Sequence, residues 1–321
     1  MKDGEKRPES GATGTPVRLL EVEADAAGRR LDNFLMSALK GLPRPRIYRM
    51  IRSGEVRVNK GRSKPSYHLA VGDVVRVPPV RGLETNAQPY VSPGRADWLN
   101  DLVLYEDDRL LVLNKPSGLA VHGGSGISLG AIELLRAARP DSHYFELVHR
   151  LDRDTSGCLL VAKKRSALRQ LHNAFRDGQV EKIYYALLLG KWVGGRREVA
   201  LPLMTEHRQN GERHVRTGKD GKAAVTRFYP ERYYDDSVYV RVELLTGRTH
   251  QIRVHAAAIG HPVAGDDRYG EGGASPAGLR RLFLHAGHLG FPHPESGEKI
   301  SIEAPLSAEL QSVLSELESS R

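Results

Sequence analysis

Cysteine is almost absent from this chain of 321 residues, in which Cys158 is the single example. One cysteine excludes a disulfide within the chain and any zinc site built from several cysteines. Because Cys158 opens the apolar run 158–162, we expect a small core residue rather than a nucleophile. No apolar stretch approaches the roughly 20 residues of a membrane span, and the polar residues 1–16 lack the apolar centre of a secretory signal. We therefore expect a cytoplasmic protein with a disordered tail at 1–16.

Acidic residues are scarce in one segment. Residues 29–79 contain 3 Asp/Glu against 12 Lys/Arg, whereas the other 270 residues contain 36 of each. The formal net charge of +9 is therefore concentrated in this segment. A basic block of this size is typical of a surface that binds nucleic-acid phosphates. A solvated basic face without a partner is the alternative.

The basic segment also has the pattern of a small folded domain. Apolar spacing predicts a helix over 30–39, and two prolines then precede a second helix over 46–53 that Gly54 ends. Alternation predicts strands at 55–59 and 74–77, the first followed by a turn at 60–61. We therefore expect one domain over residues 17–79, followed by a linker over 80–100.

The remaining residues, 101–321, are expected to form a larger domain. Strands are predicted at 102–106, 110–114, 159–162, 182–189 and 238–244, and helices at 131–138, 166–177 and 254–259. These elements alternate irregularly, which favours an α+β fold with a mainly antiparallel sheet over a doubly wound parallel sheet. The polar stretch 207–221 predicts an exposed loop, and the glycines and prolines of 260–270 predict an ordered loop.

A cluster of charge stands between apolar segments at 149–157, where the sequence reads His-Arg-Leu-Asp-Arg-Asp-Thr-Ser-Gly. Charges this close to buried strands are unfavourable unless they are paired. Asp152 is therefore either a carboxylate kept ionised for catalysis, as a nucleophile or base, or one half of a structural ion pair with Arg150 or Arg153.

Two further motifs carry polar chemistry. In the predicted strand at 182–189, alternation sends Tyr184 to one face, where it could stack on a base, move a proton or simply fill the core. The run 246–255 is crowded with polar and basic residues, of which Arg248 and Arg253 could contact phosphates or pair with Asp152. Its two histidines are five residues apart, so no metal site is expected there.

Taken together, these motifs resemble a known enzyme family. The run 149–157 is similar to the signature of the pseudouridine synthases of the ribosomal large-subunit (RluA-type) family. Three other motifs stand in that family's order, namely Asn-Lys-Pro-Ser-Gly at 114–118, Lys-Ile-Tyr at 182–184 and Gly-Arg-Thr-His-Gln-Ile-Arg-Val-His at 247–255. The basic segment 29–79 resembles an S4 RNA-binding domain.

The resemblance implies an S4 (αL-like) domain followed by an α+β catalytic domain with a largely antiparallel mixed sheet flanked by helices. It also implies that specific uridines of 23S ribosomal RNA are isomerised to pseudouridine without a cofactor or metal. The carboxylate of Asp152 would attack the nucleoside at C1′ or add to C6, and the freed uracil would rejoin through C5. The partner is expected to be the large-subunit RNA, and the protein is expected to be a monomer with no membrane association.

The same resemblance assigns roles to individual residues. Arg253 would pair with Asp152 and keep it ionised, and Tyr184 would stack on the base. Arg150 matches the arginine that fills the space left by an extruded base. Further substrate contacts are expected from Thr155, Arg248, His250 and Gln251. In the S4 segment, RNA phosphates are expected to contact Arg44, Arg46, Arg49, Arg52, Arg57 and Lys60.

Two other functions remain open at this point. A synthase of the same family could act on transfer RNA, or an S4 protein could bind RNA or assist ribosome assembly without catalysis. A protein that only binds RNA would not require Asp152, Tyr184 and Arg253 together, which favours an enzyme. The sequence does not identify the target uridines, because folded RNA is recognised by shape and by splayed bases.

Overall fold

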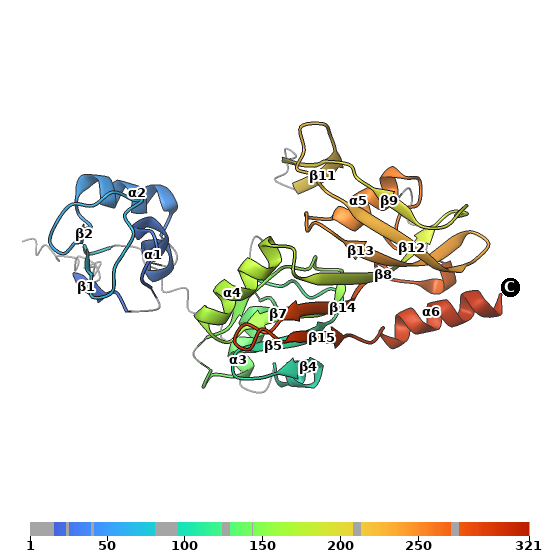
Figure 1. Cartoon of the computed structure of the whole chain (residues 1–321), viewed down its shortest axis with the longest axis horizontal. Helices are drawn as coiled ribbons and strands as arrows, with labels where there is room; N and C mark the ends of the chain where they lie inside the picture. Colours follow the sequence, from blue (N-terminus) through green and yellow to red (C-terminus); the bar gives the residue numbers. More distant parts are fainter. Residues whose placement is uncertain are drawn as a thin grey trace, which may run out of the picture. The chain divides into compact units, whose positions relative to one another are not determined.

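The computed structural model describes residues 16–23, 26–39, 42–80, 96–123, 129–142, 144–207, 213–270 and 276–320. The predicted tail, apart from residue 16, and the linker stretch 81–95 lie outside the described residues. The chain divides into two compact units, a smaller one at 1–90 and a larger one at 91–321. Figure 1 colours the smaller unit blue and the larger one from green to red.

The smaller unit packs two helices against a three-stranded sheet of order β1-β3-β2. Its elements are β1 (Arg18–Glu21), α1 (Leu31–Ala38), α2 (Arg44–Ser53), β2 (Arg57–Val58) and β3 (Val74–Val77). The predicted helices are confirmed because each buries one apolar face, such as Ile47, Met50 and Ile51 of α2. Gly54 ends α2 in a left-handed conformation with φ 78°. The sequence did not reveal β1, a four-residue edge strand that pairs with the distant β3.

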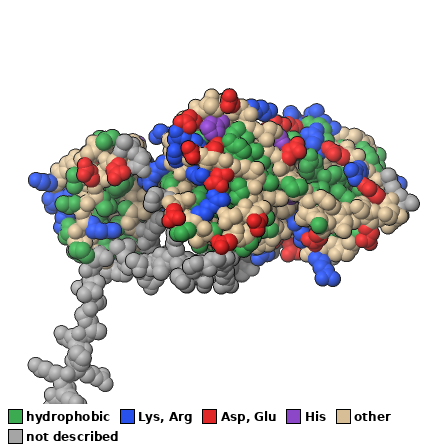
Figure 2. Space-filling model, turned by 90° about the horizontal axis from the view of Figure 1, so that it is seen from below, with side chains coloured by type: hydrophobic (Ala, Val, Ile, Leu, Met, Phe, Trp, Pro, Cys, Tyr) green, Lys and Arg blue, Asp and Glu red, His purple; other side chains and the backbone are tan. Residues whose placement is uncertain are grey.

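The apolar face of α2 leaves its arginines pointing to solvent. All six S4-segment residues expected to contact RNA are exposed: Arg44, Arg46, Arg49, Arg52, Arg57 and Lys60. On the face of the larger unit seen in Figure 2, acidic and basic side chains are instead interspersed. The excess of basic over acidic residues is therefore concentrated in the smaller unit.

The larger unit is built on a ten-stranded sheet whose main path is β4-β5-β7-β14-β8-β13-β12-β9, with β6 paired to β7 and β15 paired to β14. Its strands are β4 (Val103–Glu106), β5 (Leu110–Lys115), β6 (Glu146–Leu147), β7 (Ser156–Ala162), β8 (Glu181–Leu189), β9 (Arg197–Val199), β12 (Thr226–Tyr233), β13 (Ser237–Leu244), β14 (Leu284–Pro292) and β15 (Lys299–Glu303). Among the described strands of this sheet, only β14 and β7 pair in parallel. The predicted α+β class with a mainly antiparallel sheet is therefore confirmed.

Helices cover both faces of this sheet (Figure 1). They are the 3₁₀ segments η1 (Asp97–Leu102) and η2 (Pro276–Gly278) and the α-helices α3 (Ala131–Ala138), α4 (Arg165–Arg176), α5 (Gln251–Ala258) and α6 (Ala308–Ser319). The alternation of β8 separates two layers, because Ala186 and Leu188 pack toward α5 while Leu187 packs toward α6. Tyr184 packs where the core beneath α5 meets the core beneath α3. This junction lies under the candidate site.

The prediction of an exposed loop at 207–221 is wrong. Strands β10 (Leu203–His207) and β11 (Arg213–Thr217) form an antiparallel hairpin, and the residues between them lie outside the described part of the chain. The hairpin buries Leu203 and Val215 against Val254 of α5. The sequence looked polar because only one side of a short two-stranded ribbon is buried, so few of its residues are apolar.

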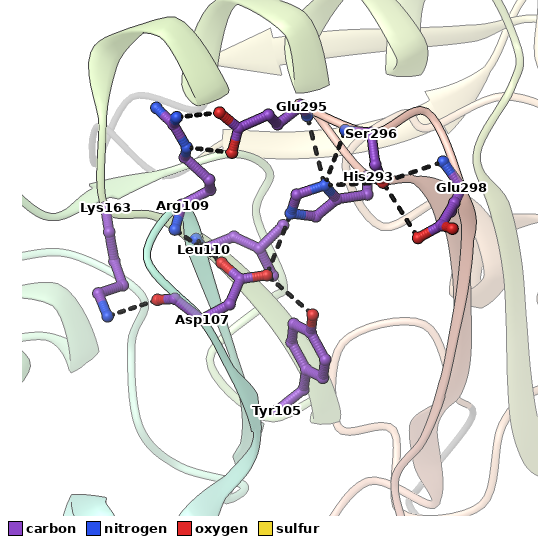
Figure 3. Close-up of polar contacts among 9 residues, drawn as sticks. All are labelled: Tyr105, Asp107, Arg109, Leu110, Lys163, His293, Glu295, Ser296 and Glu298. Atoms are coloured by element: carbon purple, nitrogen blue, oxygen red, sulfur yellow. Dashed lines mark hydrogen bonds and ion pairs between the residues drawn. The ribbon is translucent and has the colours of Figure 1, made fainter.

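A polar cluster joins the turn between β4 and β5 to the turn between β14 and β15 (Figure 3). The Asp107 carboxylate accepts hydrogen bonds from the backbone of Arg109, from the Tyr105 hydroxyl and from the His293 ring. Burial alone would raise the pKa of Asp107, but these bonds outweigh it and lower the pKa.

Among the residues that the structure describes, no helix combines the length and hydropathy that crossing a membrane requires.

Candidate active site

Asp152 lies in the loop between β6 and β7, and the motif at 114–118 holds this loop in place. The Lys115 ammonium donates to the backbone carbonyl of Arg153 at 3.0 Å, and the backbone N–H of Gly118 donates to the same carbonyl at 3.0 Å. The Ser117 hydroxyl donates to the carbonyl of Asp154 at 2.7 Å. Lys115 is buried and donates to two further carbonyls, so burial lowers its pKa to about 7. These bonds fix the backbone of the two residues that directly follow Asp152.

Gly157 fixes the end of the loop, where β7 begins. Its φ of 106° is a conformation that other residues rarely adopt, and a Cβ there would lie 2.2 Å from the carbonyl oxygen of Ala286. The missing side chain lets β7 and β14 form their short parallel pairing. This close backbone contact explains why the charged motif at 149–157 ends in glycine.

All eight predicted catalytic and substrate-contacting residues line one cavity of about 60 Å³. They come from the loop before β7, from β8 and from the segment that begins α5, and they are Arg150, Asp152, Thr155, Tyr184, Arg248, His250, Gln251 and Arg253. Arg150, Asp152, Tyr184 and Arg248 also line a neighbouring cleft of about 920 Å³. The structure thus brings together residues that are up to 103 positions apart in the sequence.

The Asp152 carboxylate is half-buried, with 26% of its side chain exposed. Among the described residues, neither Arg150 nor Arg153 forms an ion pair with it, and Arg153 pairs with Asp154 at 3.1 Å. The structural ion pairs left open by the sequence are therefore not formed. Among the described residues, the ionisable side chain within ion-pair distance of Asp152 is His250, whose Nε2 lies 3.8 Å from Oδ1 and which is charged only when protonated.

A hydrogen-bond chain orients His250 toward Asp152. His250 stands at the start of α5 with a φ of 54°, and its Nδ1 lies 2.7 Å from the Tyr269 hydroxyl oxygen. The hydroxyl oxygen accepts the backbone N–H of Val215 in β11, so its own proton can be donated to Nδ1. This arrangement favours the tautomer with the proton on Nε2, which faces Asp152. Burial lowers the pKa of His250, although the Asp152 charge opposes that shift.

The predicted ion pair between Arg253 and Asp152 is wrong. The Arg253 guanidinium instead pairs with Asp266, with Nε to Oδ2 at 2.7 Å and Nη2 to Oδ1 at 2.6 Å. Both side chains are almost fully buried. A planar guanidinium binds one carboxylate best through two parallel bonds, and Asp266 occupies that position. Burial would lower the pKa of Arg253, but pairing with Asp266 outweighs burial and raises it. The charge of Asp152 raises the pKa of Arg253 further, although the two side chains do not pair directly.

Gln251 lines the cavity but is fully bonded within the protein. Its amide donates to the carbonyl of Val225 at 3.0 Å and to the Thr226 hydroxyl at 2.9 Å. Its Oε1 accepts the backbone N–H of Arg248 and the hydroxyl of Thr246. Since all of its bonding capacity is used, the predicted substrate contact is corrected to a positioning role for the turn before α5.

Two hydroxyl groups at the cavity have no partner among the described residues. Thr155 is 2% exposed, and its Oγ1 is buried without a hydrogen bond. The Tyr184 hydroxyl has no hydrogen bond to the described part of the chain, and burial together with the nearby Asp152 charge raises its pKa. Burying a hydroxyl without a partner is unfavourable. The Tyr184 hydroxyl is therefore available to a ligand that enters the cavity, whereas Thr155 Oγ1 has almost no accessible surface and would need a local rearrangement to reach one.

Sequence reasoning missed the two residues that organise this side of the site, Asp266 and Tyr269. The loop 260–270 was interpreted only as ordered. A signal was present, because a buried arginine in α5 needs a carboxylate and Asp266 follows Arg253 by 13 positions. Spacing alone could not choose this carboxylate over Asp152.

Two family models and several curated proteins match this chain. A family model described as RNA pseudouridylate synthase matches residues 109–258, and the S4 domain model matches 29–75. The chain is 54% identical over 308 residues to the ribosomal large subunit pseudouridine synthase C of Yersinia pestis, covering 94% of this chain and 96% of that protein. It is 52% identical over 318 residues to the protein of the same description from Escherichia coli K12, covering 96% and 99%.

Solved structures show a similar fold. Human RNA Pseudouridylate Synthase Domain Containing 4 superposes with a TM-score of 0.59 at 26% identity, covering 70% of this chain and 95% of that one. Human RNA Pseudouridylate Synthase Domain Containing 1 gives a TM-score of 0.56 at 29% identity, covering 67% and 86%.

Proposed function

This chain belongs to the family of RNA pseudouridylate synthases and carries an S4 domain, and we propose that its substrate is 23S ribosomal RNA. It is an isomerase. The net reaction breaks the bond from N1 to C1′, forms a bond from C5 to C1′, and transfers the C5 proton to N1. The choice of RNA is supported by relatives at 52–54% identity that are described as large-subunit enzymes. With ribosomal RNA as its substrate, the protein is expected to act in the cytoplasm.

The observation that carries the proposed chemistry is the convergence on Asp152. The carboxylate is half-buried, and no Lys or Arg side chain among the described residues lies within ion-pair distance of it. It is therefore free to act as the nucleophile, at C1′ or at C6. Arg253 lies in the same cavity and adds positive charge nearby while remaining bonded to Asp266. His250 presents Nε2 toward the carboxylate and limits its movement.

Other cavity groups receive the base. The Tyr184 ring lines the cavity and could stack on uracil, and its hydroxyl could bond the polar edge of the base. A uridine in folded RNA reaches this cavity only after it leaves its stack, at a cost of a few kcal/mol. Phosphate contacts from the exposed arginines of α2 help to offset that cost.

Mapping of pseudouridine in a deletion strain tests the choice of substrate. We expect specific pseudouridines to disappear from 23S rRNA, and the purified protein to restore them in a 23S transcript made in vitro. Loss of pseudouridine from transfer RNA alone would show that the enzyme acts on the other RNA. Unchanged pseudouridine in both RNAs would favour a binding role for the S4 domain without catalysis.

A further inference from the structure

The cleft next to the catalytic cavity has an unusual charge composition. Its volume is about 920 Å³, and the described residues of its lining include the cationic Arg150, Arg176, Lys182 and Arg248 but only one carboxylate, Asp152. On the other side of the loop that carries Asp152, a second cleft of about 870 Å³ mixes five Lys/Arg with three Asp/Glu. The first cleft is therefore the better site for a polyanion.

Lys182 is the lysine in the described lining of this cleft, and it pairs with no carboxylate that the structure describes. It stands on β8 two residues before Tyr184, so both side chains project from the same face of the strand. Their Cα atoms are separated by about 6.6 Å, since a strand rises about 3.3 Å per residue. No ion pair joins Lys182 to any carboxylate in the described part of the chain. Its neighbour Glu181 projects to the opposite face and pairs with Lys299.

Partial burial makes it unfavourable for the Lys182 ammonium group to lack a carboxylate partner among the described residues. Lys182 is half-buried, and burial lowers its pKa. An ammonium group that loses water without gaining a counter-ion is unfavourable, and an anionic ligand would recover that free energy. The guanidinium of Arg176 at the end of α4 lines the same cleft and is 70% exposed. Its partner Asp177 lies 3.7 Å away and is also exposed, so solvent screens this pair and the guanidinium can still contact an anion.

We propose that Lys182, together with Arg176, binds a backbone phosphate of the RNA next to the uridine that stacks on Tyr184. The inference rests on the proposed function, because it requires an RNA substrate in this cavity. The apolar surface of Leu244 and Leu245 lines the same cleft and is suited to a flanking base. Lys182 thus has a binding role that is separate from the chemistry at Asp152.

Single-turnover kinetics on a 23S rRNA transcript test this role. The full-length Lys182→Met variant is compared with wild type over a range of enzyme and KCl concentrations. We expect the half-saturating enzyme concentration to rise about tenfold, as for loss of one charge-assisted hydrogen bond. We expect its log–log dependence on KCl to become shallower by about 0.7–0.9, the value for one phosphate contact. The rate at saturation should stay within about twofold of wild type.

The matched control is Lys299→Met, which removes one positive charge from an exposed lysine outside the cleft and should leave affinity and salt dependence unchanged. Lys182→Arg should restore both quantities. Lys182→Gln replaces Lys182→Met if thermal melting shows that the methionine variant is unfolded. A Lys182 variant that behaves like the Lys299 control would overturn the proposal. So would a lower saturating rate with unchanged affinity and salt slope. If wild type forms no pseudouridine in the transcript, the proposed function itself fails.

Discussion

The buried pair between Arg253 and Asp266 predicts a large loss of stability when its carboxylate is removed. Both side chains are at most 5% exposed, and two short hydrogen bonds join them. Asp266→Asn keeps the volume but removes the one buried carboxylate that pairs with the guanidinium, leaving, among the described residues, only the exposed Asp267 and the more distant Asp152 as negative charges nearby. Breaking a buried pair in this way costs about 3–5 kcal/mol of the free energy of unfolding. Urea denaturation followed by tryptophan fluorescence measures that loss, since both tryptophans, Trp98 and Trp192, belong to the larger unit.

The neighbouring carboxylate supplies the control. Asp267 lies 3.8 Å from the same guanidinium, but its side chain is 93% exposed. Asp267→Asn should therefore change the stability by less than about 1 kcal/mol. In a double-mutant cycle with Arg253→Met, the Asp266→Asn effect should shrink by at least about 2 kcal/mol. A loss below about 1 kcal/mol for Asp266→Asn, or equal losses for both carboxylates, would refute the account of this pair.

The same pair makes a prediction about acid. Burial alone would raise the pKa of Asp266, but the bonds and charge of Arg253 outweigh it and lower the pKa below the ordinary aspartate value. The stabilisation is therefore complete above about pH 4 and is lost as the pH falls further. The stability difference between wild type and Asp266→Asn should be constant from neutral pH down to about pH 5, and should narrow in stronger acid.

Three other substitutions test separate parts of the site. Gly157→Ala should cost about 3 kcal/mol or more in the same urea assay, because φ is 106° and the new Cβ meets the Ala286 carbonyl. Burial lowers the pKa of His149 to about 4, so this residue should make stability fall as the pH drops from about 6.5 to 4. His149→Gln should reduce that slope while keeping the acceptor for a backbone N–H, and the other buried histidines should account for the slope that stays. Tyr269→Phe should slow single-turnover pseudouridine formation about fivefold with unchanged RNA affinity, since it frees Nδ1 of His250.

Local sequence patterns predicted much of the fold. The helix at 131–138 and the strand at 74–77 were predicted with the bounds that the structure gives, because their apolar spacing is decided within a few residues. Strand β1 and the hairpin of β10 and β11 were missed. Both are short ribbons with few apolar residues, and both depend on pairing partners that local patterns do not reveal.

In the candidate site, too, local motifs predicted the residues but not their distant partners. The motifs selected eight residues, and the structure places all of them around one cavity. What the sequence could not supply was the pairing among them. Arg253 could have met Asp152 or Asp266, and only the packing of the loop 260–270 against α5 decides between the two. The partnerless state of Lys182 is likewise visible only once β8 and its surroundings are placed.

The central claim is that Asp152 performs the chemistry, and one comparison tests it most directly. Asp152→Asn and Asp154→Asn are assayed for pseudouridine formation on a 23S transcript and for binding to the same RNA. Asp154 is the other carboxylate of the motif and pairs with Arg153. We predict that Asp152→Asn lowers the rate by at least about 10³-fold and still binds RNA, whereas Asp154→Asn keeps most of the activity. Pseudouridine formation by Asp152→Asn at a rate close to wild type would contradict the account.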